Sequence, residues 1–275
     1  MKNLDFYAVF GSPIQHSKSP RIHTLFAEQT NQSLEYFAQE VKAENFVTAT
    51  TVFFKQGGRG LNCTVPLKEL AWQFADKKTA RAESAKAVNT LIKQEDGSIL
   101  GDNTDGVGLV NDLTLNHGIE LNNKRILILG AGGATRGILL PLLEQRPDYL
   151  IVANRTIEKV LTLALDFYHS FESSSFEALE DEQFDVILNA TSASLTNELP
   201  PLPKNLLAKN GICYDLAYSN QPTAFVRWGN SQNASKSLDG LGMLVEQAAE
   251  AFMLWRGIRP NSKMVIDLLN LERNA

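Results

Sequence analysis

The segment Ile126-Leu127-Ile128-Leu129-Gly130-Ala131-Gly132-Gly133-Ala134 is the most informative part of this 275-residue chain. Four consecutive aliphatic residues predict a buried strand, and the glycines after them predict a tight turn into a helix that begins at Thr135. Dinucleotide-binding sites need this arrangement. One glycine allows the turn, a second lets the backbone approach the pyrophosphate, and the helix start offers free N–H groups. The turn alone leaves open the alternative of a structural turn without a ligand.

A second buried strand, expected at residues 149–153, refines this interpretation. It is followed by Asn154-Arg155-Thr156, with Lys159 one helical turn further on. NAD-binding domains usually carry an acidic residue here for the ribose hydroxyl. A carboxylate would repel the 2′-phosphate of NADP, whereas the guanidinium of Arg155 can bind it through two hydrogen bonds. The residues therefore favour NADP(H), and the alternative is a solvent-facing arginine at a strand end.

Strand and helix signals alternate along the chain, which predicts an α/β fold with parallel strands. The remaining strands are expected at residues 6–10, 34–38, 60–65, 87–92, 184–189 and 211–215. Helices are expected from Pro20 onward and at residues 47–54, 67–78, 80–85, 106–116, 157–167, 241–255 and 262–271, with a hairpin turn at Asp96-Gly97. The character of the sequence changes after Asp102. We therefore expect a first domain over residues 1–103 and a second over 104–238. The loop near Asp239-Gly240 suggests the hypothesis that C-terminal helices over 239–275 return to the first domain.

The composition excludes several classes of protein. Apolar residues make up 44% and charged residues 21%, as in globular proteins rather than disordered chains or coiled coils. The net charge of −5, without a basic cluster, argues against binding to nucleic acid or anionic membranes. No apolar stretch approaches the ~20 residues that span a bilayer. Cys63 and Cys213 could form a disulfide, but none is expected in a cytosolic chain, and the four histidines show no metal-ligand spacing. We expect a cytoplasmic, metal-free monomer or homodimer.

Polar clusters in the first domain suggest a ligand site. Ser17 and Ser19 lie two apart and can face one anionic group, although Ser19 could instead cap the helix at Pro20. Asn62 and Thr64 are expected on one strand face at its carboxyl end, where open α/β sheets bind ligands. Lys68 follows in a first helical turn, an unfavourable place for a cation. The alternative is an ordinary surface lysine.

Two further clusters lie nearer the expected domain boundary and the C-terminus. Asn89 and the segment Gly101-Asp102-Asn103-Thr104-Asp105-Gly106 supply amides and two carboxylates. Asp102 or Asp105 could instead merely cap a helix. Met243 and Gln247 are four residues apart and share one helix face, which is also compatible with a core methionine and a solvated glutamine.

Together these segments closely resemble the shikimate dehydrogenase family. The matched segments, in family order, are residues 17–20, 62–68, 87–90, 101–106, 130–134, 154–156 and 240–244, followed by Gln247. The resemblance covers nearly the whole chain. It implies an NADP-dependent enzyme that interconverts shikimate and 3-dehydroshikimate in the pathway to aromatic amino acids. It also implies an N-terminal substrate domain, a Rossmann-like cofactor domain, and a C-terminal helix that returns to the first domain.

The resemblance also implies site residues. Lys68 and Asp105 would be the catalytic pair, and Ser17 and Ser19 would hold the substrate carboxylate. The other substrate-binding residues would be Asn62, Thr64, Asn89, Tyr218 and Gln247, with Lys68 and Asp105 also in contact. The cofactor-binding residues would be Gly130, Ala131, Gly132, Gly133, Ala134, Asn154, Arg155, Thr156, Lys159, Leu216 and Gly240.

Three positions depart from the family pattern: Ala80 where many members carry an acid, Lys159 where arginine is common, and the small Ala217. Three alternative functions remain. A non-catalytic NADP-binding sensor would be expected to have lost Lys68 or Asp105. A methyltransferase would leave Arg155 and the first domain unexplained. A quinate-preferring dehydrogenase is the closest competitor, and Ser19 together with Arg155 favours shikimate and NADP.

Overall fold

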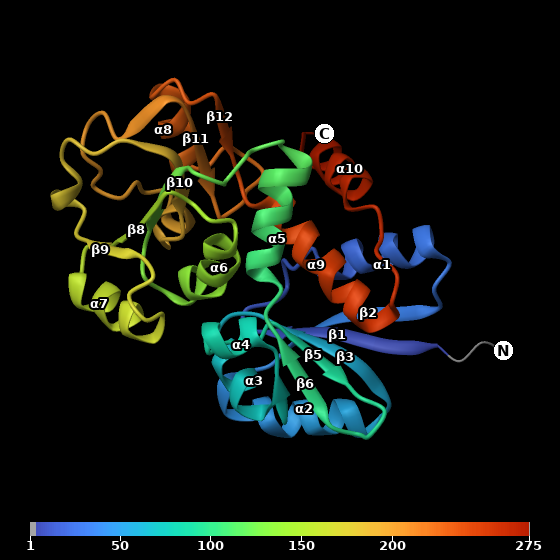
Figure 1. Ribbon diagram of the computed structural model, residues 1–275. Coiled ribbons are helices and arrows are strands. Elements are labelled where there is room, and N and C mark those ends of the chain that lie inside the picture. The colour runs from blue at the N-terminus through green and yellow to red at the C-terminus, as the bar shows by residue number, and fades with distance from the viewer. Residues whose placement is uncertain (1–3, 275) are drawn as a thin grey trace. The chain divides into compact units, whose positions relative to one another are not determined.

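The computed structural model describes residues 4–274 (Figure 1). Two compact units make up the chain. The first runs to Gly108 and includes Leu244–Arg273, and the second is Leu109–Met243. The chain passes between the units inside helix α5 (Asp105–Asn111) and again inside helix α9 (Leu241–Arg256). The two boundaries between the units, 108/109 and 243/244, lie a few residues beyond the domain boundaries expected from the sequence, 103/104 and 238/239.

One six-stranded sheet forms the centre of the first unit. Its strands lie in the order β2 (Leu34–Glu40), β1 (Asp5–Gly11), β3 (Gly58–Cys63), β5 (Thr90–Lys93), β6 (Ile99–Asp102) and β4 (Lys77–Lys78). Strand β5 is antiparallel to both of its neighbours, β3 and β6, whereas β1 pairs in parallel with β2 and β3. The carboxyl ends of β3 and β6 therefore lie at the same edge of the sheet.

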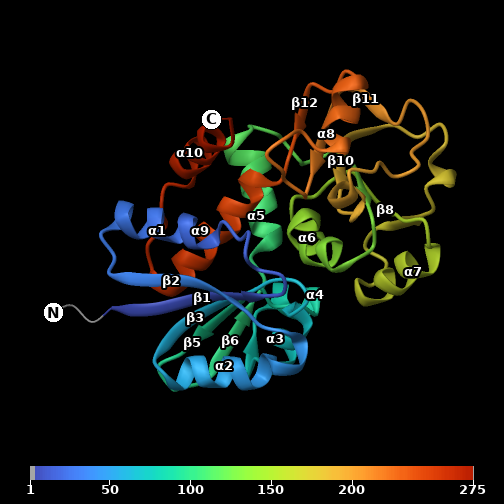
Figure 2. The same ribbon diagram turned by 180° about the vertical axis from the view of Figure 1, so that it is seen from behind.

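Helices cover both faces of this sheet, as Figure 1 shows and Figure 2 shows from behind. One face carries α2 (Phe46–Lys55), α3 (Lys68–Phe74) and α4 (Ala80–Ala85), and the other carries α1 (Ser19–Thr30) and α9. Successive residues of β1 serve opposite faces, because side chains alternate along a strand. Phe10 packs with Phe53 of α2, whereas Tyr7 packs with Trp255 of α9. Helix α10 (Ser262–Asn274) follows α9, and its Glu272 pairs with Arg21 of α1.

The second unit contains a fully parallel sheet. Its strands lie in the order β12 (Lys236–Leu238), β11 (Leu207–Asp215), β10 (Phe184–Asn189), β7 (Arg125–Leu129), β8 (Tyr149–Ala153) and β9 (Glu172–Ser174). The connecting helices are α6 (Gly133–Glu144), α7 (Ile157–Asp166) and α8 (Ala224–Ser231). The strand order reverses at β7, so the unit is Rossmann-like. Residues 126–129 are all fully buried, as expected of a strand covered on both faces. The predicted α/β class is confirmed.

Several element predictions were wrong or incomplete. Helix α3 ends at Phe74 instead of Lys78, because Asp76 exchanges hydrogen bonds with Ile99 and draws the chain into strand β4. Tertiary pairing here overrides helix propensity. Strand β3 ends at Cys63, so Thr64 lies beyond it, and β5 begins only at Thr90.

The remaining differences concern short elements. The helix predicted at 106–116 is α5 followed by a π-helical turn, Asp112–Asn116. The elements that were not predicted are β4, β6, β9, α8, β12 and the short helical turns Ala43–Asn45, Glu177–Leu179 and Ala193–Thr196. None of the helices in residues 4–274 combines the length and apolarity needed to cross a membrane.

Candidate active site

Lys68 and Asp105 form an ion pair at the edge of the first sheet. Lys68 is the first residue of α3, which follows β3, and Asp105 is the first residue of α5, which follows β6. Lys68 Nζ donates to Asp105 Oδ2 at 2.5 Å, with 29% and 12% of the side chains exposed. The backbone of Lys68 is also fixed, since its carbonyl accepts from Val88 N–H at 2.9 Å. Lys68 is therefore not a free surface lysine.

Asn89 holds the second oxygen of Asp105. Its Oδ1 accepts from the Thr104 backbone N–H at 2.9 Å, and its Nδ2 donates to Asp105 Oδ1 at 2.8 Å. Because a backbone N–H can only donate, this contact fixes the orientation of the Asn89 amide. Both carboxylate oxygens of Asp105 therefore accept a hydrogen bond, one from an ammonium and one from an amide.

Gln247 of α9 lies against the same cluster. Its Oε1 is 3.3 Å from Asn89 Nδ2 and 3.4 Å from Thr104 Oγ1, and its Nε2 donates to the Leu244 carbonyl at 2.8 Å. The interpretation of Gln247 as a solvated surface residue is therefore wrong. Met243 packs against the core of the second unit.

Asn62 extends the cluster toward helix α1. Its Nδ2 donates to Thr90 Oγ1 and to the Asn89 carbonyl, each at 3.0 Å, and its Oδ1 accepts from Tyr36 OH at 2.7 Å. His23 of α1 stacks on Tyr36 with ring centroids 4.1 Å apart. Burial lowers the pKa of His23 to about 3, so this imidazole is neutral at physiological pH. The sequence did not single out Tyr36, His23 or Thr90.

Ser17, Ser19 and Thr64 lie in the segments that enter α1 and leave β3. Ser17 Oγ accepts from Ser19 N–H at 3.3 Å. The helix cap of α1 is Lys18, without a side-chain capping bond, so the alternative role of Ser19 as a cap is wrong. Thr64 donates its N–H to the Phe10 carbonyl at 2.9 Å, and its methyl group faces Gly11, where a Cβ would collide with it.

The glycine turn of the second unit leaves open space at the start of α6. Gly130 has a φ of 101°, and a Cβ there would lie 3.1 Å from the Ala190 carbonyl oxygen, so glycine is required. A Cβ at Gly132 or Gly133 would meet no atom within 4 Å. The first turn of α6 has no acidic residue and no side-chain cap. Its N–H groups are thus free for an anion, and the turn fits a dinucleotide diphosphate.

Two exposed cations follow strand β8. Asn154 Nδ2 donates to the Thr156 carbonyl at 2.9 Å, which shapes the loop after the strand. Arg155 and Lys159 are exposed, and across residues 4–274 neither side chain has a hydrogen bond or an acidic partner. Two unneutralised cations on one loop and helix start suit a phosphate monoester. The alternative of a plain surface arginine stays open.

Leu216, Tyr218 and Gly240 belong to a loop pair in the second unit. Gly240 N–H donates to the Ala217 carbonyl at 3.0 Å, and a Cβ at Gly240 would collide with the Leu216 carbonyl. Burial and the nearby Asp239 raise the pKa of the half-buried Tyr218. The sequence missed Asp215, which anchors this loop.

Asp215 is fully buried at the end of β11. Its carboxylate accepts from Ser194 and Thr223 hydroxyls at 2.5 Å each, from Asn189 Nδ2 at 3.1 Å, and from Ala217 N–H at 3.2 Å. Burial raises the pKa of Asp215, while these four donors oppose the shift. No group of three or more potential metal ligands occurs in the described part of the chain.

A Rossmann-like unit with a glycine turn, joined to a second α/β unit that carries a lysine–aspartate pair, defines the class of two-domain nicotinamide-dependent dehydrogenases. Family models narrow the class. Residues 9–91 match the shikimate dehydrogenase substrate binding domain, residues 112–198 match shikimate / quinate 5-dehydrogenase, and residues 240–267 match the shikimate 5'-dehydrogenase C-terminal domain.

Related proteins match this chain over nearly its full length. The shikimate dehydrogenase (NADP(+)) of Methylococcus capsulatus is 58% identical, over 100% of this chain and 99% of that protein. An Ael1 enzyme from Pseudomonas putida has a TM-score of 0.91 at 47% identity, covering 96% of this chain and 98% of that one. Shikimate 5-dehydrogenase from Thermus thermophilus, in complex with NADP(H) and shikimate, has a TM-score of 0.87 at 31% identity, covering 98% and 100%. The chain therefore belongs to the shikimate dehydrogenase family, as its sequence motifs indicated.

Proposed function

We propose that this chain catalyses the NADP-dependent interconversion of shikimate and 3-dehydroshikimate, with Lys68 and Asp105 as the catalytic pair. The observation that carries the proposal is the 2.5 Å contact between Lys68 Nζ and Asp105 Oδ2 within a cluster of neutral amides. An alcohol oxidation needs a hydride acceptor and an acid/base group. NADP supplies the hydride acceptor, and the pair supplies the acid/base group.

The proton step is assigned to Lys68. In the oxidation, the hydroxyl proton moves to a neutral Lys68 Nζ while the adjacent C–H gives up its hydride. In the reduction, the Lys68 ammonium returns a proton to the forming alkoxide. Asp105 keeps Nζ in place and stabilises the ammonium through charge, an interaction made in the transition state as well as in the product.

The substrate carries a carboxylate and three ring hydroxyls, and the first unit offers partners for both. Ser17 and Ser19 would donate to the carboxylate. Amide and carboxylate oxygens suit the hydroxyls, because each hydroxyl both donates and accepts. The residues assigned to the hydroxyls are Asn62, Thr64, Asn89, Asp105 and Gln247, and the family resemblance adds Tyr218.

The second unit is assigned to the cofactor. Residues 130–134 would hold the pyrophosphate on the free N–H groups of α6. Arg155, Thr156 and Lys159 would bind the 2′-phosphate, with Asn154 shaping their loop. Leu216 and Gly240 would line the nicotinamide side. The first unit, which ends at Gly108 and resumes at Leu244, is accordingly assigned to the substrate, and Leu109–Met243 is assigned to NADP.

The experiment is a comparison of four reactions: shikimate or quinate, each with NADP or NAD, followed by the absorbance of the reduced cofactor. We expect the highest kcat/KM with shikimate and NADP. Lys68→Ala should lower kcat at least about a hundredfold and leave the Kd for NADP unchanged. Lys77, which pairs with Asp96 on the surface at 3.0 Å, provides the matched control, Lys77→Ala. A preference for quinate or NAD, or a Lys68→Ala enzyme with normal kcat, would overturn the proposal.

A further inference from the structure

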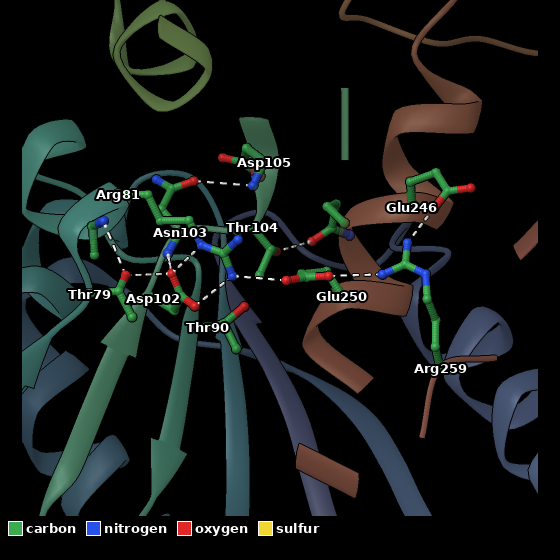
Figure 3. A network of polar contacts seen from close by, with 12 residues as sticks. Thr79, Arg81, Thr90, Asp102, Asn103, Thr104, Asp105, Glu246, Glu250 and Arg259 are labelled. Atoms are coloured by element: carbon green, nitrogen blue, oxygen red, sulfur yellow. Dashed lines mark hydrogen bonds and ion pairs between the residues drawn. The ribbon is translucent and has the colours of Figure 1, made fainter. Parts of the chain in front are cut away.

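Arg81 of α4 binds a buried carboxylate that none of the roles above involves. Its Nε and Nη2 donate to Asp102 Oδ1 and Oδ2, each at 2.7 Å (Figure 3). Asp102 is 1% exposed and also accepts from Thr79 Oγ1 at 2.6 Å. Such two-bond contacts fix both partners in direction as well as distance. The alternative role of Asp102 as a helix cap is therefore secondary to its pairing with Arg81.

A short path leads from Asp102 to Asp105. Asn103 N–H donates to Asp102 Oδ1 at 2.7 Å, and Asn103 Oδ1 accepts from Asp105 N–H at 3.1 Å. Asn103 Nδ2 is held by the Ala87 carbonyl at 3.1 Å. Hydrogen bonds thus hold Asp102, Asn103 and the Asp105 backbone in the turn that enters α5, and Arg81 holds Asp102.

A second path leads from Arg81 to helix α9. Arg81 Nη2 donates to Glu250 Oε1 at 3.1 Å, and Glu250 Oε2 accepts from Arg259 Nη1 at 2.8 Å. Arg259 Nη2 then donates to Glu246 Oε2 at 2.8 Å (Figure 3). Glu246 and Glu250 are one turn apart, and Gln247 lies between them, so these contacts set the rotation of α9 where Gln247 contacts Asn89.

We propose that Arg81 is a positioning residue for the reaction, which holds Asp105 through Asp102 and Gln247 through Glu250. This inference rests on the function proposed above. Displacements of about 1 Å at such groups are enough to lower turnover strongly. Arg81 touches neither member of the catalytic pair, so its effect must pass through these two paths.

The same unit offers a matched control. Arg256, the last residue of α9, pairs with Asp5 Oδ2 at 2.5 Å and binds Gln32 Oε1 at 2.6 Å and 2.9 Å. Its side chain is 17% exposed, close to the 21% of Arg81. Arg256 thus anchors the same helix at its other end, and its hydrogen bonds within residues 4–274 go to β1 and to the loop before β2. If Arg81 served stability alone, replacement of Arg81 and replacement of Arg256 would have the same effect on the kinetics.

The experiment compares Arg81→Gln with Arg256→Gln in the full-length protein. We expect Arg81→Gln to raise the KM for shikimate and lower kcat, each about three- to tenfold, with an unchanged KM for NADP. Arg256→Gln should lower Tm by a similar amount and leave all three constants near wild type. If the two variants lose Tm equally and show the same kinetics, Arg81 is structural only and the inference fails.

Glu250→Gln separates the two paths, because it weakens the contacts of Glu250 with Arg81 and Arg259 and leaves the Arg81–Asp102 pair in place. We expect a raised KM for shikimate with a smaller loss in kcat, and no further rise when it is combined with Gln247→Ala. Additive effects of these two substitutions would overturn the α9 path. If Arg81→Gln does not fold, Arg81→Lys replaces it, since a lysine keeps the charge and loses the two-bond contact. A wild type without shikimate turnover would instead remove the proposed function itself.

Discussion

Asn89 Nδ2 lies 2.8 Å from Asp105 Oδ1, and the Thr104 backbone N–H prevents the amide from turning over. Asp105 therefore meets two donors, the Asn89 amide, whose orientation is fixed, and the Lys68 ammonium. A carboxylate satisfies both, whereas a group with one donor and one acceptor can satisfy only one. The local chemistry at position 105 thus distinguishes an aspartate from an asparagine of nearly the same shape.

Asp105→Asn follows from this relationship. Its amide oxygen can accept from Asn89, which turns its NH2 group toward Lys68 Nζ, donor against donor. We expect kcat/KM for shikimate to fall at least about a hundredfold, while Tm changes by only a few degrees. Steady-state kinetics and thermal unfolding measure the two effects. Kinetics equal to wild type would reduce Asp105 to a helix-start residue.

Ser17→Ala and Ser19→Ala test the carboxylate site. Loss of a hydrogen bond to a charged group costs about 1.5–3 kcal/mol, so the KM for shikimate should rise about tenfold or more in each variant. A shikimate analogue without the carboxylate should bind weakly to wild type and lose little further in either variant. Thr24→Ala, in α1 like Ser19, is the control, because the Thr24 hydroxyl donates to the Pro20 carbonyl of its own helix. Equal losses for both ligands would show that the serines face another group.

Arg155→Ala tests cofactor choice. The 2′-phosphate is present in NADP and absent in NAD. Removal of its charged partner should therefore weaken NADP binding by about 2–3 kcal/mol, or roughly 30- to 150-fold in Kd, and leave NAD binding nearly unchanged. Lys159→Ala should act in the same direction, less strongly, and with an effect that shrinks as salt rises. Kd values for both cofactors decide the matter. The exposed Lys209 of β11 gives the control Lys209→Ala, and equal weakening of both cofactors by Arg155→Ala would contradict the assignment.

His23 predicts a pH dependence of stability. Its pKa is about 3 in the folded protein, against 6.5 for the ordinary imidazole. Between these values the unfolded chain binds the extra proton, so unfolding becomes easier as pH falls. The contribution of the neutral His23 to the free energy of unfolding is fully present above pH 6.5 and declines below it by at most about 1.4 kcal/mol per pH unit.

The variant for this test is His23→Phe, which keeps a ring against Tyr36 and cannot titrate. We expect its free energy of unfolding to depend less on pH between 6.5 and 4 than that of wild type, as measured by urea unfolding. His16→Gln, at an exposed position, should follow the wild-type curve. Parallel curves for His23→Phe and wild type would show that His23 does not carry the effect.

The elements that the sequence predicted well are those with a local cause. The strand at residues 126–129 and the turn after it depend on consecutive aliphatic residues and on a glycine at positive φ, and both signals lie within a few residues. The end of α3 has no such signal. It is set by Asp76 and Ile99, which are 23 residues apart in sequence and pair only once the sheet has formed.

The same distinction applies to the site. Lys68, Asn89 and Asp105 could be proposed from motif resemblance, and the structure brings them into contact. Tyr36 and Asp215 could not, because each looks like an ordinary strand residue until its partners are known. Their partners are Asn62, 26 residues from Tyr36, and Asn189, 26 residues from Asp215.

The interruption of the first unit by the second has a consequence for synthesis on the ribosome. Residues 109–243 emerge as one uninterrupted stretch and can fold as soon as they are clear, since domains fold as units while the chain grows. Strands β1 to β6 emerge earlier, yet one face of their sheet lacks α9 until residues 244–273 have been made. The bonds from Trp255 Nε1 to the Leu91 carbonyl and from Arg256 to Asp5 must then form last. In a chain that ends before Leu244, residues 109–243 should accordingly resist protease, whereas the residues up to Gly108 should be cleaved.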